Sequence, residues 1–225
     1  MLRIHRERRG LYARHWKALL TAPVAALSAV VLLVTTGTGT AQAEPPKPPS
    51  ASEAKKQLDE LKVAPEGSMD GYDRDKFPHW IDQGGGCDTR EAVLKRDGQG
   101  VETGSDCYPT KGTWTSPYDD GKWTKPSDLD IDHVVPLAQA WRSGASKWTQ
   151  KQRQAFANNL EISQLLAVTD NVNQEKSDKD PAQWMPPKKD YHCTYARMWI
   201  WVKHETKLTA DDAEKKALTK ALGTC

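Results

Sequence analysis

Apolar and acidic residues alternate along residues 129–137, and this stretch has the most regular pattern in the chain. A period of two is typical of a β-strand with one buried face. The strand is expected to end at Asp132-His133, shortly before Pro136. An acid beside a histidine is more often a hydrogen-bonded pair than a chemical site, so this dipeptide needs support from other parts of the chain.

Helical periodicity and capping residues predict most of the larger elements. The expected N-caps are Ser52 for the first helix, Asp88 or Thr89 for the second, and Thr209 for the last. The expected helices span residues 53–63, 88–96, 137–142, 149–157, 191–203 and 210–222.

Strand signals precede and follow the alternating stretch. The Asp-Asp-Gly sequence at 119–121 predicts a tight turn, so a strand before it can pair with one that begins at Lys122. Residues 162–168 are apolar enough for a strand or a buried helical turn, and so short a segment does not separate the two. Together the patterns predict an α+β fold. The remaining expected strands span residues 101–108 and 112–118.

Residues 1–43 have the three parts of an export signal: a basic start, an apolar run at 18–34 and a small-x-small site at Ala41-Gln42-Ala43. An uncleaved membrane anchor is the alternative, because the apolar run is nearly long enough to cross a bilayer. Cleavage is the favoured interpretation and predicts a secreted protein with no stable membrane partner. The basic residues are Arg3, Arg6, Arg8, Arg9, Arg14 and Lys17.

The predicted mature chain divides into a Pro-rich linker with a short helical arm at 44–70 and one domain at 71–225. The whole chain has 32 basic and 30 acidic residues, of which six and one lie in residues 1–43, so the remainder carries a net charge of −3. Bulk charge therefore does not indicate nucleic-acid binding. A phosphate ligand would need a local patch or a metal ion.

Four cysteines remain after the signal: Cys87, Cys107, Cys193 and Cys225. An even count in an exported chain, with no Cys-x-x-Cys spacing, favours two disulfides over a zinc site. Pairing Cys87 with Cys107 and Cys193 with Cys225 is preferred because each bridge then joins neighbouring segments. The other two connectivities stay open.

The candidate chemistry joins Asp132-His133 to the polar run around Asn173 and Lys176. His133 can act as a base, because imidazole titrates near neutrality. Asp132 and Asn173 offer hard oxygen ligands of the kind that magnesium prefers, and Lys176 can contact a phosphate. A calcium loop beginning at Asp128 is excluded, because His133 stands where that loop needs glycine.

The order Asp-His-x-x-Pro followed by Asn-x-x-Lys resembles the HNH endonucleases, whose ββα-metal core carries the Asp-His pair on a hairpin and another metal ligand on a helix. The chain is more narrowly similar to secreted bacterial HNH endonucleases, a family related to the C-terminal domain of modification-dependent restriction enzymes. The segments that carry the resemblance are residues 130–141, 143–145, 153 with 156–158, 168–176, 180–186 and 193–195.

The resemblance implies that His133 is the general base and that Asp132 and Asn173 hold a divalent metal, most simply Mg²⁺, with Mn²⁺ as an alternative. Such sites usually contain a further asparagine that orients the base. Gln164 stands where it is expected, which leaves the orienting role open between Gln164, Asn159 and no residue.

The resulting hypothesis is a secreted, monomeric, metal-dependent endonuclease that hydrolyses phosphodiester bonds in DNA, with RNA as a second substrate and without a small-molecule cofactor. His133, Gln164 and Lys176 are its candidate catalytic residues. One alternative is a binding or toxin-like protein that keeps the HNH scaffold without catalysis. Another is a metal hydrolase that acts on a substrate other than nucleic acid.

Overall fold

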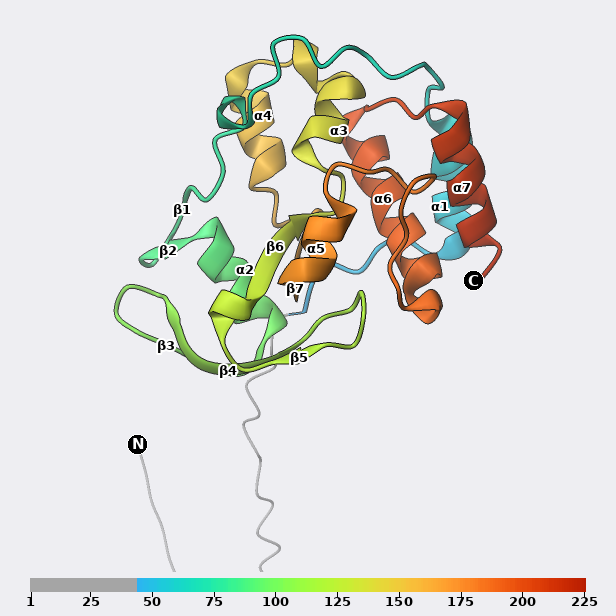
Figure 1. Cartoon of the computed structure of the whole chain (residues 1–225). Coiled ribbons are helices and arrows are strands. Elements are labelled where there is room, and N and C mark those ends of the chain that lie inside the picture. The colour runs from blue at the N-terminus through green and yellow to red at the C-terminus, as the bar shows by residue number, and fades with distance from the viewer. Residues whose placement is uncertain (1–43) are drawn as a thin grey trace, which may run out of the picture. The chain divides into compact units, whose positions relative to one another are not determined.

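The computed structural model describes residues 44–225 and has the expected α+β composition (Figure 1). The predicted signal sequence and its apolar run lie outside these residues. No helix among the described residues is long and apolar enough to span a bilayer. The helices are α1 (Ala51–Glu60), α2 (Thr89–Asp97), α3 (Leu137–Arg142), α4 (Gln150–Ala157), α5 (Asp170–Lys176), α6 (His192–Thr206) and α7 (Asp212–Leu222). Short 3₁₀ turns are η1 (Arg74–Lys76), η2 (Pro126–Asp128), η3 (Ala145–Lys147) and η4 (Lys189–Tyr191).

The seven described strands form three small antiparallel sheets, in the orders β1-β2, β3-β4-β5 and β6-β7. The expected hairpin forms between β4 and β5, where Trp114 pairs with Trp123, but its connection spans residues 116–121 because the first strand ends at Thr115. The strands are β1 (Asp82–Gly84), β2 (Cys87–Asp88), β3 (Gln99–Thr103), β4 (Pro109–Thr115), β5 (Lys122–Trp123), β6 (Leu129–His133) and β7 (Leu165–Thr169).

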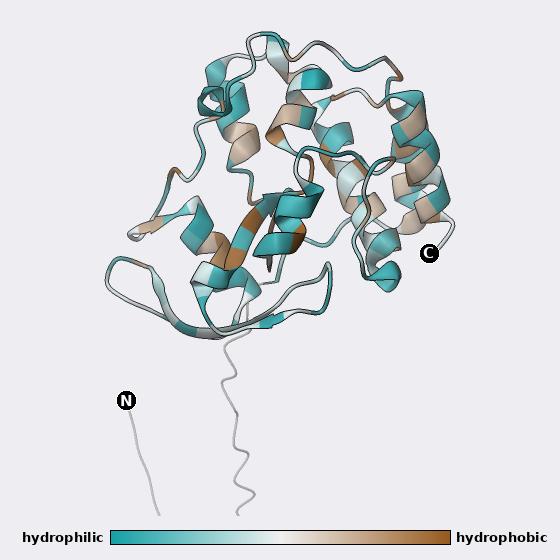
Figure 2. Cartoon of the chain, viewed as in Figure 1, coloured by the Kyte–Doolittle hydropathy of each residue, from teal (hydrophilic) through white to brown (hydrophobic). Residues whose placement is uncertain are grey.

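The first five residues of the alternating stretch form strand β6. The apolar segment that the sequence left undecided contributes its partner strand, β7. Period-two alternation gives β6 two chemically different faces. Leu129 and Ile131 join the apolar cluster that α2 completes, whereas Asp130 and Asp132 face α5. Figure 2 shows the mostly hydrophilic α5 beside this strand, which carries brown apolar positions. Strands β6 and β7 pair antiparallel beside α5, but α3 and α4 are inserted between them, so the Asp-His strand is not part of the hairpin that the resemblance implies.

Helix α1 packs into the main hydrophobic core beside α6 and α7, through the buried side chains of Ala54, Leu58 and Leu61. It begins earlier than expected, because Ser50 rather than Ser52 is its N-cap and accepts a hydrogen bond from the Glu53 amide. The Pro-rich segment before it also contacts the domain. Arg197 donates hydrogen bonds to the carbonyl oxygens of residues 48 and 49.

Capping explains where the other helices begin. Asp88 caps α2 in a capping box with Glu91, and Thr149 caps α4 in the same way. Helix α7 begins after the expected position, because Asp211, not Thr209, accepts the hydrogen bond of the Glu214 amide.

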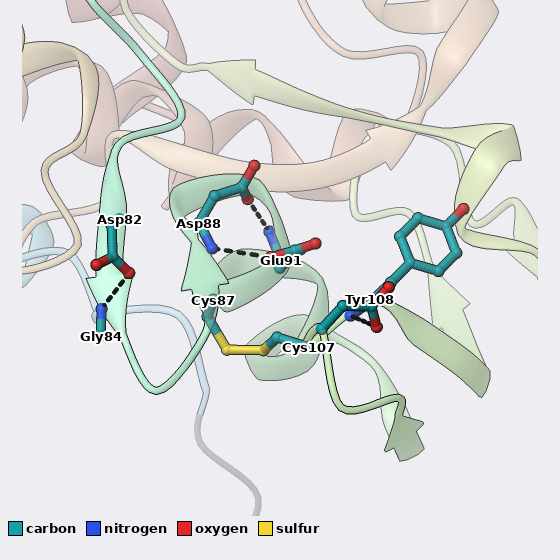
Figure 3. The surroundings of a disulfide bond; sticks show 8 residues. Asp82, Gly84, Cys87, Asp88, Glu91, Cys107 and Tyr108 are labelled. Atoms are coloured by element: carbon teal, nitrogen blue, oxygen red, sulfur yellow. Dashed lines mark hydrogen bonds between the residues drawn. A yellow bond between two sulfur atoms is a disulfide. The ribbon is translucent and has the colours of Figure 1, made fainter.

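The two disulfides have the preferred connectivity, Cys87–Cys107 and Cys193–Cys225. Figure 3 shows the first bridge, which ties the strand before α2 to the loop between β3 and β4. The second joins the first turn of α6 to the chain end after α7, across 32 residues. The bridges therefore fasten segments at two different ends of the domain.

The Cys193–Cys225 bridge predicts a measurable loss of stability when it is removed. Closing a loop of this length lowers the entropy of the unfolded chain, so a Cys193→Ser/Cys225→Ser variant should lose roughly 3 to 4 kcal/mol of unfolding free energy. Urea denaturation measures this loss. Mass mapping of non-reduced peptides provides the control, and a Cys87–Cys193 peptide would contradict the connectivity.

Candidate active site

A cavity of about 560 Å³ lies where β6 ends, beside α5 and the turn η1. It brings together three of the predicted site residues, Asp132, His133 and Asn173. Lys176 and Gln164 do not line it. The complete lining consists of Met69, Tyr72, Arg74, Ile131, Asp132, His133, Pro136, Leu137, Ala138, Asn173, Gln174, Ser177 and Asp178.

The carboxylate of Asp132 is 4% exposed and accepts hydrogen bonds at both oxygens. The Lys176 ammonium donates to one oxygen over 2.8 Å, and the Tyr118 hydroxyl donates to the other over 2.6 Å. Burial keeps the pKa of Tyr118 well above its usual value, so this hydroxyl stays a donor. Asp132 is consequently held rigidly, and each oxygen keeps a further lone pair for another partner.

Lys176 is fully buried and lies between Asp132 and the carbonyl oxygen of His133, to which it donates over 3.0 Å. Burial lowers the pKa of Lys176 and raises that of Asp132, while their contact opposes both shifts. Since the ammonium has three donors and finds two acceptors here, the geometry favours the ionised pair. Helix α5 thus places the Lys176 ammonium against the Asp132 carboxylate and the His133 carbonyl oxygen.

His133 is buried, and its Nε2 atom donates to the carbonyl oxygen of Ala157 over 2.9 Å. That bond places the proton on Nε2 and leaves Nδ1 unprotonated. Burial lowers the pKa of His133 from 6.5 to about 3, so the imidazole is neutral at physiological pH. A neutral imidazole with one nitrogen anchored by a carbonyl can accept a proton at the other nitrogen.

Gln164 is fully buried and pairs with the backbone of Val135 at both ends of its amide, over 3.1 and 2.9 Å. This arrangement fixes the chain directly after the dipeptide. The imidazole instead donates to the backbone carbonyl oxygen of Ala157, a partner that no side-chain pattern reveals. Asn159 instead accepts bonds from the amides of Glu161 and Ile162.

Asn173 lies one turn before Lys176 on α5 and donates its amide Nδ2 to Asp130 over 3.0 Å. Burial, together with the nearby Asp170, raises the pKa of Asp130. Asp130 was not among the predicted site residues, although the period of two places it on the same strand face as Asp132. Because this hydrogen bond uses only the Nδ2 atom of Asn173, its Oδ1 atom is available to another partner.

The segment of residues 69–80, which the sequence patterns did not assign to the site, contributes Met69, Tyr72 and Arg74 to the lining and packs against His133. The Trp80 ring stacks on the imidazole of His133 at 5.7 Å between centroids, and the His79 ring lies edge-on at 6.4 Å. Asn158 holds this segment, because it accepts from the Ile81 amide and donates to the Pro78 carbonyl. Aromatic stacking and tethering together fix the environment of the imidazole.

The donor set fits a hard divalent cation. Asp132 offers carboxylate lone pairs and Asn173 offers a free amide oxygen, and magnesium typically needs only a few protein oxygens beside water and phosphate. A separate group of carboxylates, Glu66, Asp180 and Asp211, also has ligand atoms within 4.8 Å of one another. Protein partners account for that group, because Arg142 pairs with Glu66, backbone amides bind Asp180, and Asp211 caps α7.

Fold and site together define an α+β protein with a buried Asp-His pair at the end of a strand, beside a helix that supplies an asparagine and a lysine. Residues 90–221 match the model of the family described as GmrSD restriction endonucleases, C-terminal domain, and the chain belongs to this family. The predicted relation to restriction enzymes is confirmed. Membership in a bacterial HNH group stays a prediction.

The chain is also 55% identical over 202 residues to an uncharacterized secreted protein of Arthroderma benhamiae, a match that covers 90% of this chain and 98% of the relative. No solved structure matches the chain. The secreted relative and the two disulfides confirm the expected extracellular location.

Breaking the buried ion pair should destabilise the protein. A Lys176→Met substitution leaves the Asp132 carboxylate buried with one donor fewer, which costs about 3 to 5 kcal/mol in comparable pairs. Urea denaturation of the purified variant measures the change.

An exposed lysine of α4 provides the control, since Lys151→Met removes the same charge from the surface. Adding Asp132→Asn to Lys176→Met should recover part of the loss. Equal stabilities of the Lys176→Met and Lys151→Met proteins would contradict the ion pair.

Proposed function

We propose that this protein is an exported HNH-type endonuclease that hydrolyses phosphodiester bonds in DNA with the help of a divalent metal, and that residues 1–43 are removed on export. RNA is a second possible substrate class. Membership in a restriction endonuclease family supports the nuclease assignment. The observation that carries the mechanism is the neutral, carbonyl-anchored His133 in one cavity with Asp132 and Asn173.

In the proposed reaction, the unprotonated Nδ1 of His133 takes a proton from water as the water oxygen attacks phosphorus and the P–O bond to the sugar oxygen breaks. The leaving sugar oxygen takes a proton from solvent, and His133 then returns its proton to solvent. The low pKa of His133 reflects burial, and a phosphodiester anion in the cavity would favour the protonated imidazole. The Ala157 carbonyl would keep the ring oriented while Nδ1 receives the proton. The metal, Mg²⁺ or Mn²⁺, would be held by Asp132 and Asn173 and would neutralise charge on the phosphate.

The catalytic roles predicted for Lys176 and Gln164 stay predictions. The contact of Lys176 with Asp132 supports a role through that carboxylate, and the bonds of Gln164 to Val135 support a role through the backbone beside His133. Both would act by positioning the residues that touch water and metal.

A second candidate function is a binding protein that keeps this scaffold without catalysis. The observation in its favour is that both oxygens of Asp132 already accept hydrogen bonds from buried protein groups. Metal binding separates the two candidates, because the catalytic proposal requires Asp132 to accept a cation as well.

The catalytic proposal predicts that the purified protein nicks supercoiled plasmid in magnesium and stops when a chelator is added. His133→Ala should reduce cutting by at least about 100-fold, the lower end for loss of a general base. Gel electrophoresis measures the cutting, and circular dichroism checks the fold.

His204 offers the matched control, because it pairs with Glu60 and does not line the cavity. His204→Ala should cut like the unchanged protein. Full cutting by the His133→Ala protein would overturn the mechanism.

Calorimetric titration with magnesium should show one binding event that weakens roughly 10-fold or more in Asn173→Ala, as expected when a metal site loses a ligand. Asn171→Ala is the matched control, since Asn171 is exposed on the same helix and absent from the cavity lining. No binding to the unchanged protein would favour the second candidate function.

A further inference from the structure

Arg74 is the positively charged residue of the cavity that the Asp-His dipeptide lines. It lies in η1, and its side chain lines the cavity together with His133 and Asn173. The residue is exposed. It precedes residues 90–221, so the family match does not include it.

The other guanidinium groups in residues 44–225 are all engaged by the protein. They bind backbone carbonyl oxygens, and in two cases carboxylates as well, so each has a structural role. These groups belong to Arg90, Arg96, Arg142, Arg153 and Arg197. Within the same range, the guanidinium of Arg74 has neither a hydrogen bond nor an ion pair. Its five donors remain available to a ligand.

The other charged groups of the cavity are already balanced. Asp132 pairs with Lys176, and Asp178 pairs with Arg142 over 2.7 Å. That ion pair lowers the pKa of Asp178. Among the arginine and aspartate residues of the lining, Arg74 is therefore the one without an ion pair within residues 44–225. An anionic group in the cavity therefore has this guanidinium as its natural partner.

The backbone that carries Arg74 is held in place although its side chain is free. Asp73 caps η1 by accepting from the Asp75 amide over 2.9 Å, and the Phe77 side chain directly after the turn is fully buried. Arg153 also donates to the carbonyl oxygen of Lys76 over 3.0 Å. A fixed backbone together with an unbonded guanidinium suits a residue that binds a ligand.

We propose that Arg74 binds the phosphate of the substrate phosphodiester, with its planar guanidinium donating two hydrogen bonds to the non-bridging oxygens. This inference rests on the proposed function and adds a substrate-binding group from outside the family region. Arginine suits this role because its donors match the geometry of phosphate and its charge is permanent. The contact would hold the phosphorus atom within reach of water beside His133.

Arg74→Ala should weaken substrate use in the magnesium-loaded protein. KM for a short DNA duplex should rise roughly 10- to 100-fold, the range for losing a hydrogen bond to a charged group. Arg74→Lys should recover part of the loss, since it restores the charge without the paired donors. Lys216→Ala is the control, because it removes an exposed charge from α7, which contributes no residue to the lining.

Binding without cleavage gives an independent measurement. In the His133→Ala background, adding Arg74→Ala should weaken duplex binding and lower the slope of log K against log salt by about 0.9, the value for one phosphate contact. A merely structural role would leave that slope unchanged.

Equal binding, salt slope and KM in the Arg74→Ala and Lys216→Ala proteins would overturn the role of Arg74 while leaving the nuclease proposal intact. Duplex binding that depends on Arg74, without any cutting by the unchanged protein, would overturn the nuclease proposal and keep the phosphate contact. Absence of both cutting and binding would overturn both.

Discussion

The buried contact between Lys176 and Asp132 is the interaction on which the candidate site depends. Two ions removed from water are tolerated only when their geometry is good and their remaining groups are bonded. Here Tyr118 and the His133 carbonyl complete the arrangement, so one ammonium fixes both residues of the dipeptide. The same contact fastens helix α5 to strand β6, because Lys176 ends that helix. Site geometry and tertiary packing are therefore two consequences of one ion pair.

Strand alternation explains why two adjacent residues can do different things. Asp132 points to the face that α5 covers, whereas His133 belongs to the face lined by Leu129 and Ile131. The carboxylate thus meets cations and donors, while the imidazole meets Trp80 and a backbone carbonyl. The apolar surroundings keep the imidazole neutral, and the polar surroundings fix the carboxylate by hydrogen bonds. At the end of this strand, the His133 imidazole is therefore suited to accept a proton, and the Asp132 carboxylate is suited to bind a positively charged group.

The sequence predicted the parts of the fold that local patterns determine, such as the alternating strand, the Asp88 cap and both disulfides. It left residues 162–168 undecided, because only pairing with β6 makes them a strand. Within the site, spacing pointed to Asp132, His133 and Asn173, and the structure places all three on one cavity. It could not identify the Ala157 carbonyl, since every residue has a backbone oxygen. Tyr118 was also missed, because its contact with Asp132 depends on how the β4–β5 turn folds back.

Residues 69–80 show why the family region alone gives an incomplete description of the site. The matched region supplies Asp132, His133, Asn173 and Lys176, but Met69, Tyr72 and Arg74 of the cavity lining come from chain that precedes it. Asn158 bonds to that preceding chain at Pro78 and Ile81, and it lies directly after the Ala157 carbonyl that anchors His133. The same turn at the end of α4 therefore orients the imidazole and positions the aromatic ring stacked against it. Changes in the preceding segment can therefore alter the environment of His133 without changing any residue of the matched region.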